Sequence, residues 1–171
     1  MSLDELGNVA ELISSIAVLI SLVYLAIQIR GNTEAARMST YQSIVADFSA
    51  LNRVMASTPD LSMLYVNAME NFGTLTPDEK ARVSQLFFTS FHNFENMFYQ
   101  SRKGYLEDDV WLGWKRLMLT YHAQPGVQTW WGKRKDVFSA SFVEFLRTEK
   151  PDKVIATYRD IATLTGDQKK Q

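Results

Sequence analysis

The chain has 171 residues, with 18 basic and 19 acidic side chains and a formal net charge of −1. Because proteins that bind polyanions usually carry a basic excess or a basic patch, this balance predicts no nucleic-acid partner. The absence of cysteine excludes a disulfide framework, a thiolate zinc site and a cysteine nucleophile.

The first predicted element is an apolar helix. No residue from Leu12 to Ile29 is charged, and these roughly 18 residues would form a helix about 27 Å long, at the short end of what spans a bilayer. Leu, Ile and Val occupy every side of it, as in helices that lie in lipid or deep in a large core. The remaining residues are too few to surround such a helix. We therefore predict a membrane anchor over residues 1–30; the alternative is a soluble oligomer that shares residues 9–29 as its core.

The charges around this run predict an orientation. Acidic residues precede it, so it lacks the basic start of a cleaved signal peptide. Basic residues follow it, at Arg30, Arg37 and Arg53. The positive-inside rule then places the N-terminus outside and residues 30–171 in the cytoplasm, as a single-pass protein of the inner membrane.

One face of the same helix carries small and polar residues. They recur at spacings of three and four: Ala10, Ser14, Ala17, Ser21, Tyr24 and Gln28. In lipid, such a stripe lets two helices approach closely and bond across the contact, which predicts self-association or contact with another membrane protein. The alternative is that the serine hydroxyls bond to carbonyl groups of their own helix.

Beyond the anchor we predict an all-α domain over residues 31–165, a bundle of about five to six helices, followed by a flexible tail over 166–171. Gly31 predicts a kink or a helix restart, with Thr33 as the cap. Helices are expected to start near Pro59, near Pro77 and near Glu107. A short helix is expected to carry Trp130 and Trp131, and a last helix is expected to start at Pro151. The helix that starts at Pro77 also has a Thr-x-x-Glu capping box and should run to residue 103.

The helix over residues 77–103 holds the candidate chemistry. Beside a stripe of phenylalanines, one face carries four polar residues that could reach a common cavity: His92, Glu95, Tyr99 and Arg102. Three interpretations remain open: a metal site, an acid–base or small-molecule pocket, and a structural network in which Glu95 pairs with arginine, tryptophan or tyrosine donors. The balance favours the structural network, so we predict no metal and no cofactor. A non-enzymatic role is favoured over the alternative, a small-molecule-binding protein or acid–base enzyme with its site at these four residues.

Two segments carry a resemblance. "ISLVYLAIQIRGNTEAARMSTYQ" and "FHNFENMFYQSRKGYLEDDVW" resemble a widespread family of uncharacterised bacterial proteins with an N-terminal hydrophobic helix and an aromatic-rich helical domain. Gly31 departs from that pattern, where a larger polar residue is expected. The resemblance implies a membrane anchor and a helical domain but no activity and no catalytic residue. The function we predict is an accessory or scaffold subunit that acts through helix–helix association.

Overall fold

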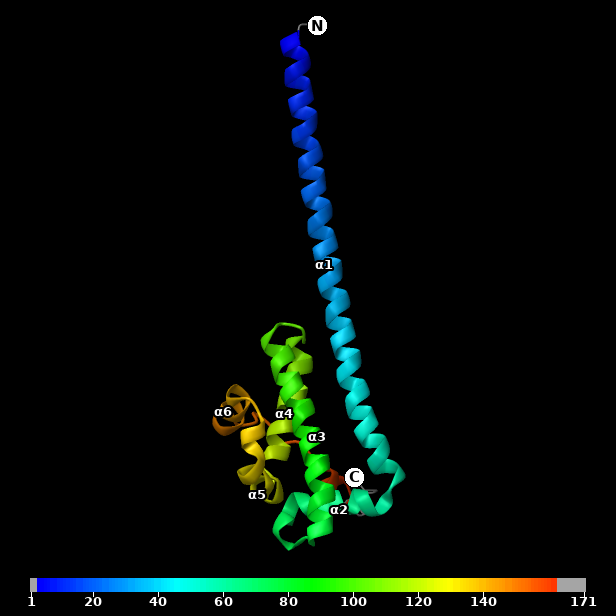
Figure 1. Cartoon of the computed structure of the whole chain (residues 1–171), viewed down its shortest axis with the longest axis vertical. Helices are drawn as coiled ribbons and strands as arrows, with labels where there is room; N and C mark the ends of the chain where they lie inside the picture. The colour runs from blue at the N-terminus through cyan, green and yellow to red at the C-terminus, as the bar shows by residue number, and fades with distance from the viewer. Residues whose placement is uncertain (1–2, 163–171) are drawn as a thin grey trace, which may run out of the picture. The chain divides into compact units, whose positions relative to one another are not determined.

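A computed structural model describes residues 3–162 of the chain (Figure 1). The fold is all-α, as predicted, and no β-strand occurs between residues 3 and 162. Its helices are α1 (Leu3–Ser57), α2 (Pro59–Asn71), α3 (Pro77–Arg102), α4 (Asp108–His122), α5 (Pro125–Arg134), α6 (Ala140–Thr148) and α7 (Tyr158–Ala162), with short 3₁₀ turns η1 (Phe72–Thr74) and η2 (Lys135–Val137). The predicted tail over 166–171 lies outside the described residues.

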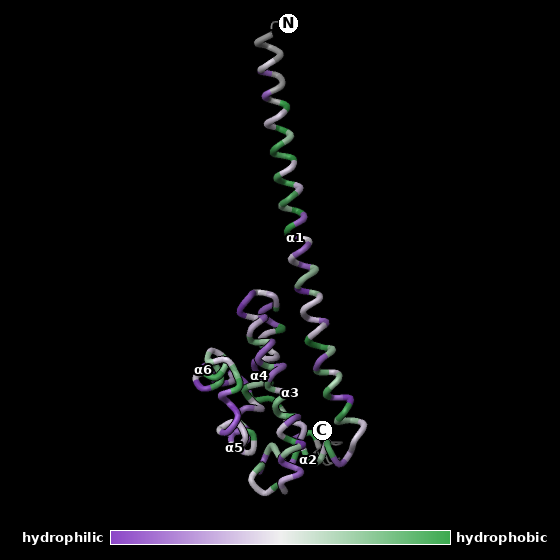
Figure 2. Tube along the Cα trace, in the orientation of Figure 1, coloured by the Kyte–Doolittle hydropathy of each residue, from purple (hydrophilic) through white to green (hydrophobic). Residues whose placement is uncertain are grey.

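The chain divides into an N-terminal unit, Met1–Ser39, and a helical domain, Thr40–Gln171. In the described part of the N-terminal unit, α1 contains an apolar run long enough to cross a membrane, drawn as the mostly green section of α1 in Figure 2. The large apolar side chains between residues 13 and 29 are 48–64% exposed. Such exposure of a continuous apolar run is expected of a helix that belongs in lipid or against another chain.

The predicted break at Gly31 was wrong. Helix α1 continues through Gly31, Asn32 and Thr33 without interruption. The Thr33 hydroxyl donates to the Ile29 carbonyl oxygen at 2.9 Å, one turn back, and so does not cap a new helix. A single glycine lowers helix propensity by only about 1 kcal/mol, which the flanking helix-forming residues can offset.

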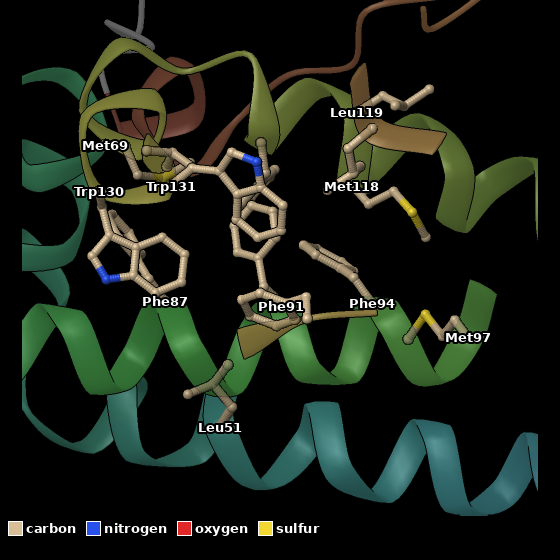
Figure 3. Packing of buried hydrophobic residues seen from close by; sticks show 14 of the residues in the cluster. Leu51, Met69, Phe87, Phe91, Phe94, Met97, Met118, Leu119, Trp130 and Trp131 are labelled. Atoms are coloured by element: carbon tan, nitrogen blue, oxygen red, sulfur yellow. The ribbon is translucent and has the colours of Figure 1, made fainter. Parts of the chain in front are cut away.

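An aromatic core holds the helical domain together. The predicted stripe on α3 is buried, with exposed fractions of 0–8%: Phe87, Phe91, Phe94 and Phe98. The Phe87 and Phe91 side chains point toward the tryptophans of α5 (Figure 3). The Phe87 and Trp130 rings meet edge to face at 5.5 Å, and the Phe91 and Trp131 rings lie 5.1 Å apart. The Trp130 indole N–H donates to the Ser84 hydroxyl at 2.8 Å, so burial leaves that donor satisfied.

Helices α2 and α5 approach each other very closely. The contact is at Gly126, in the first turn of α5, whose backbone packs on Ala68 and Met69 of α2. A Cβ atom at this position would overlap the Ala68 carbonyl oxygen and lie 2.9 Å from the Met69 carbonyl carbon and oxygen. The contact therefore requires glycine because no side chain fits, and not because of an unusual backbone angle.

Most predicted helix starts are confirmed because their signals are local. Thr76 caps α3: its hydroxyl accepts from the Glu79 N–H, and the Glu79 carboxylate accepts from the Thr76 N–H at 2.8 Å. At the other end, Gly104 adopts a positive φ of 74° directly after the cap residue Lys103.

The predicted helix start at Pro151 was wrong, because the segment after α6 is tied to α4 in a non-helical form. The Asp152 carboxylate accepts two bonds from the Arg116 guanidinium, at 2.9 and 2.5 Å. The Ile155 N–H donates to the Thr120 hydroxyl at 3.4 Å. These contacts compete with local helix formation, so the last helix, α7, begins only at residue 158.

Candidate functional site

The four candidate residues on α3 line one hollow. Its volume is about 660 Å³, and it lies between α3 and the start of α6. Its walls comprise His92, Glu95, Asn96, Phe98, Tyr99, Arg102, Lys103, Ser139 and Ser141. The expectation that the four polar residues reach a common cavity is therefore met. The serines that complete the wall were missed, although Ser139 just before the apolar run of α6 is a recognisable N-cap signal.

Glu95 connects α3 to α6. One carboxylate oxygen accepts from the Ser139 backbone N–H at 2.6 Å, and the other lies 3.3 Å from His92 Nδ1. Ser139 is the N-cap of α6, where unpaired N–H groups and the helix dipole favour a negative charge. The expected arginine, tryptophan or tyrosine partners of Glu95 are therefore wrong: its main partner is a backbone donor. Both of its oxygens therefore have a contact within the domain.

The open side of the hollow is basic and aromatic. The Arg102 guanidinium lies 5.5 Å from the centre of the Phe98 ring, and Lys103 Nζ lies 5.5 Å from that of Tyr99. The Tyr99 side chain itself is 55% exposed. Aromatic rings hold both cations near the hollow while leaving their donors available. Such an arrangement can bind a small anion; no catalytic step follows from it.

A metal centre finds no ligand set here. Among the residues that the structure describes, no three His, Asp or Glu side chains gather closely enough to hold an ion. His92 and Glu95 thus form an isolated pair, and His122 lies on α4 against the rings of Phe91 and Trp131.

Along the stripe of α1, the polar groups bond within their own helix. The Ser21 hydroxyl donates to the Ala17 carbonyl oxygen at 2.9 Å, and Gln28 Nε2 donates to the Tyr24 hydroxyl at 2.8 Å. Ser14 is also engaged in an interaction, and the side chain of Ala10 lies outside the described part. The Ser21 hydroxyl therefore does not need a partner helix, and association through this residue would depend on close packing of small side chains.

We expect Glu95→Ala to lower the free energy of unfolding by about 1–3 kcal/mol, because it leaves the Ser139 N–H without its charged acceptor. Glu95→Gln keeps an acceptor oxygen but loses the charge, so it should cost about half as much. Urea denaturation followed by circular dichroism measures both variants. Equal stability of the alanine variant and the natural protein would show that the contact does not hold α6.

His122 predicts a pH dependence of stability. Burial, and then the nearby charge of Lys150, lower the pKa of this imidazole from 6.5 to about 4. The unfolded chain thus binds a proton between pH 6.5 and 4 that the folded chain does not, so stability falls as the pH decreases through this window, by at most about 3 kcal/mol. His122→Phe should flatten this part of the urea-denaturation profile. An unchanged slope between these pH values would contradict the assignment.

Between residues 3 and 162, these features define a class of protein: one helix long enough to span a membrane, followed by a helical domain with an aromatic core and a polar hollow between α3 and α6. No protein-family model, curated protein or solved structure matches the chain.

Proposed function

We propose that this protein is a single-pass protein of the inner membrane, with its N-terminus outside and its helical domain in the cytoplasm. The domain would act as an accessory or scaffold subunit that joins its partners through helix–helix association. The observation that carries the proposal is the exposed apolar run in α1, between residues 13 and 29. Burying that surface in lipid stabilises it by about 25 cal/mol for each Å² removed from water.

Two sequence features support the remaining parts of the proposal. The basic residues Arg30, Arg37 and Arg53 follow the apolar run, which favours a cytoplasmic domain. The resemblance to bacterial proteins with the same two segments supports an inner-membrane location. An accessory role is favoured because Glu95, the best candidate for chemistry, is engaged in holding α6.

Cysteine labelling tests the anchor and its orientation together. The chain has no cysteine of its own, so Asn8→Cys and Lys133→Cys each introduce a unique thiol at an exposed position. A membrane-impermeant maleimide applied to intact spheroplasts should label the first variant and not the second, and lysis should expose both. Labelling of only the second variant in intact spheroplasts would reverse the proposed orientation. Absence of both variants from the membrane fraction would overturn the anchor.

The stripe on α1 makes association in the membrane testable. Ala17→Leu combined with Ser21→Leu should reduce self-association or partner association at least severalfold, because bulky side chains keep helix backbones apart. A membrane two-hybrid assay measures this. Leu22→Val and Val23→Leu, on other faces of the helix, together form the matched control. Unchanged association of the Ala17/Ser21 variant would remove the stripe from the proposal.

A second candidate function is binding of a small molecule in the hollow between α3 and α6. It is favoured by one observation: His92, Glu95, Tyr99 and Arg102 all line that hollow. If the hollow binds a small molecule, the Tyr99→Ala and Arg102→Ala variants should fail to restore the phenotype of a strain that lacks the natural gene, although both variant proteins are present at the normal level. Full complementation of that strain by both variants would contradict this second function and favour the accessory role.

A further inference from the structure

A second hollow lies on a different part of the helical domain. It is formed by the end of α4, by α5 and α6, and by residues 149–151, and its volume is about 540 Å³. This is within the range of sites that hold small organic molecules. Its walls comprise Leu119, His122, Ala123, Gln128, Trp131, Gly132, Lys135, Val143, Leu146, Arg147, Glu149, Lys150 and Pro151. None of these residues has a part in the function proposed above.

The floor of this hollow is apolar and belongs to the packed core. Leu119, Trp131 and Leu146 contribute to it, and they belong to the core with exposed fractions of 2%, 6% and 3%. Gly132 leaves space on one side, because a Cβ atom added there would meet no heavy atom within 4 Å. A flat or branched apolar group therefore finds a preformed surface, and little ordering of side chains opposes its binding.

The rim of the hollow carries an excess of positive charge from three separate elements. Lys135 lies in η2, Arg147 in α6 and Lys150 in the segment after it. The one acidic residue of the rim, Glu149, is bound to Lys115 at 2.6 Å. Arg147 is neutralised by Glu144 at 2.5 Å. Among the described residues, neither Lys135 nor Lys150 has a carboxylate within ion-pair distance, so two positive charges face the hollow without compensation.

His122 lies in the wall of the hollow and is also affected by its excess of positive charge. Its Nε2 atom is shielded from solvent and has no hydrogen-bond partner among the described residues. The imidazole is neutral at pH 7 because burial and the charge of Lys150 lower its pKa to about 4. Lys150 and His122 both line the hollow, although Lys150 remains exposed to solvent. A bound anion would offset that charge.

We propose that this hollow binds a small amphiphilic carboxylate, with its acidic group between Lys135 and Lys150 and its apolar body on Trp131, Leu119 and Leu146. The combination accounts for both parts of the wall: the floor favours an apolar group and the rim favours a single negative charge. Lysine suits this role since its ammonium group can meet a carboxylate from many directions. The proposal is independent of the membrane anchor and of the first hollow.

Isothermal titration calorimetry with 2-naphthoate tests the proposal on the full chain in nanodiscs of zwitterionic lipid, with empty nanodiscs as the blank. We expect saturable binding of one naphthoate per chain. Neutral 2-naphthamide has the same shape and should bind at least about tenfold more weakly, because it lacks the charge. The double variant Lys135→Gln/Lys150→Gln should weaken naphthoate binding by a similar factor. Lys133→Gln, a neighbouring exposed position outside the hollow, should leave it unchanged.

Gly132→Leu tests the location. The leucine side chain would fill the hollow while improving helix propensity in α5, so binding should be lost with the melting temperature kept or raised. If the Gly132→Leu variant is less stable than the natural protein, the location of the site is tested by the Lys135→Gln/Lys150→Gln variant alone. The proposal is overturned if naphthoate and naphthamide bind equally, or if no saturable binding occurs at millimolar naphthoate. It is also overturned if a stable Gly132→Leu variant, or the Lys135→Gln/Lys150→Gln variant, binds naphthoate as tightly as the natural protein.

Discussion

Gly126→Ala is expected to destabilise the helical domain strongly. The added Cβ would overlap the Ala68 carbonyl oxygen and lie 2.9 Å from the Met69 carbonyl group. These are backbone atoms within a helix, which cannot move aside like the end of a flexible side chain. Helices α2 and α5 would have to separate, and the buried contact of Trp130 with Phe87 would loosen with them. We expect a loss of more than about 3 kcal/mol in the free energy of unfolding.

Urea denaturation monitored by circular dichroism measures this loss. Gly132→Ala provides the control within the same helix, because a Cβ there meets no heavy atom within 4 Å. Its higher helix propensity should leave the domain unchanged or more stable by up to about 1 kcal/mol. The pair therefore separates close packing from a general effect of replacing glycine. A Gly126→Ala variant as stable as the control would show that α2 and α5 do not meet as described.

The double variant Leu19→Arg/Val23→Arg is expected to remove the protein from the membrane fraction. Each arginine at the centre of a spanning helix opposes insertion by about 2.5–3.5 kcal/mol, and both positions lie within the exposed apolar run. The protein should then appear in the soluble fraction, in aggregates or as degradation products. Cell fractionation with immunoblotting measures the distribution.

The matched control for this variant exchanges the same two residues, as Leu19→Val/Val23→Leu, and keeps the apolar character of both positions. It should remain in the membrane fraction. Full retention of the arginine variant in the membrane would mean that this part of α1 does not lie in lipid. Two buried arginines would also destabilise a core shared between the chains of a soluble oligomer. Loss of the arginine variant from the membrane fraction therefore does not by itself distinguish lipid from such a core, and the natural protein has to be measured as well.

Features of the fold that depend on a few neighbouring residues could be predicted. The cap of α3 is complete within the four residues from Thr76 to Glu79, and its geometry is the expected one. The phenylalanine stripe follows from the helical period alone, so its burial could also be predicted. The placement of four polar residues around one hollow follows from the same period, because all four lie on one face of α3.

Apart from the local misprediction at Gly31, what could not be predicted depends on contacts between distant residues. Pro151 is a good local start signal, but Asp152 bonds to Arg116, 36 positions earlier, and holds the chain in another conformation. Glu95 finds its partner at Ser139, 44 positions later. The second hollow draws on α4, α5 and α6, so its lysines have no common spacing in the sequence. Only the packing of the helices brings such groups together.

Alkaline carbonate extraction of the natural protein tests the central claim most directly. High pH opens membrane vesicles and releases proteins held at the surface by charge or by other proteins, whereas a helix buried in lipid stays behind. If the run between residues 13 and 29 spans the bilayer, the full-length protein remains in the membrane pellet and enters solution only with detergent. Its quantitative release by carbonate, as a folded oligomer on a sizing column, would contradict the anchor and assign this run to a core shared between chains.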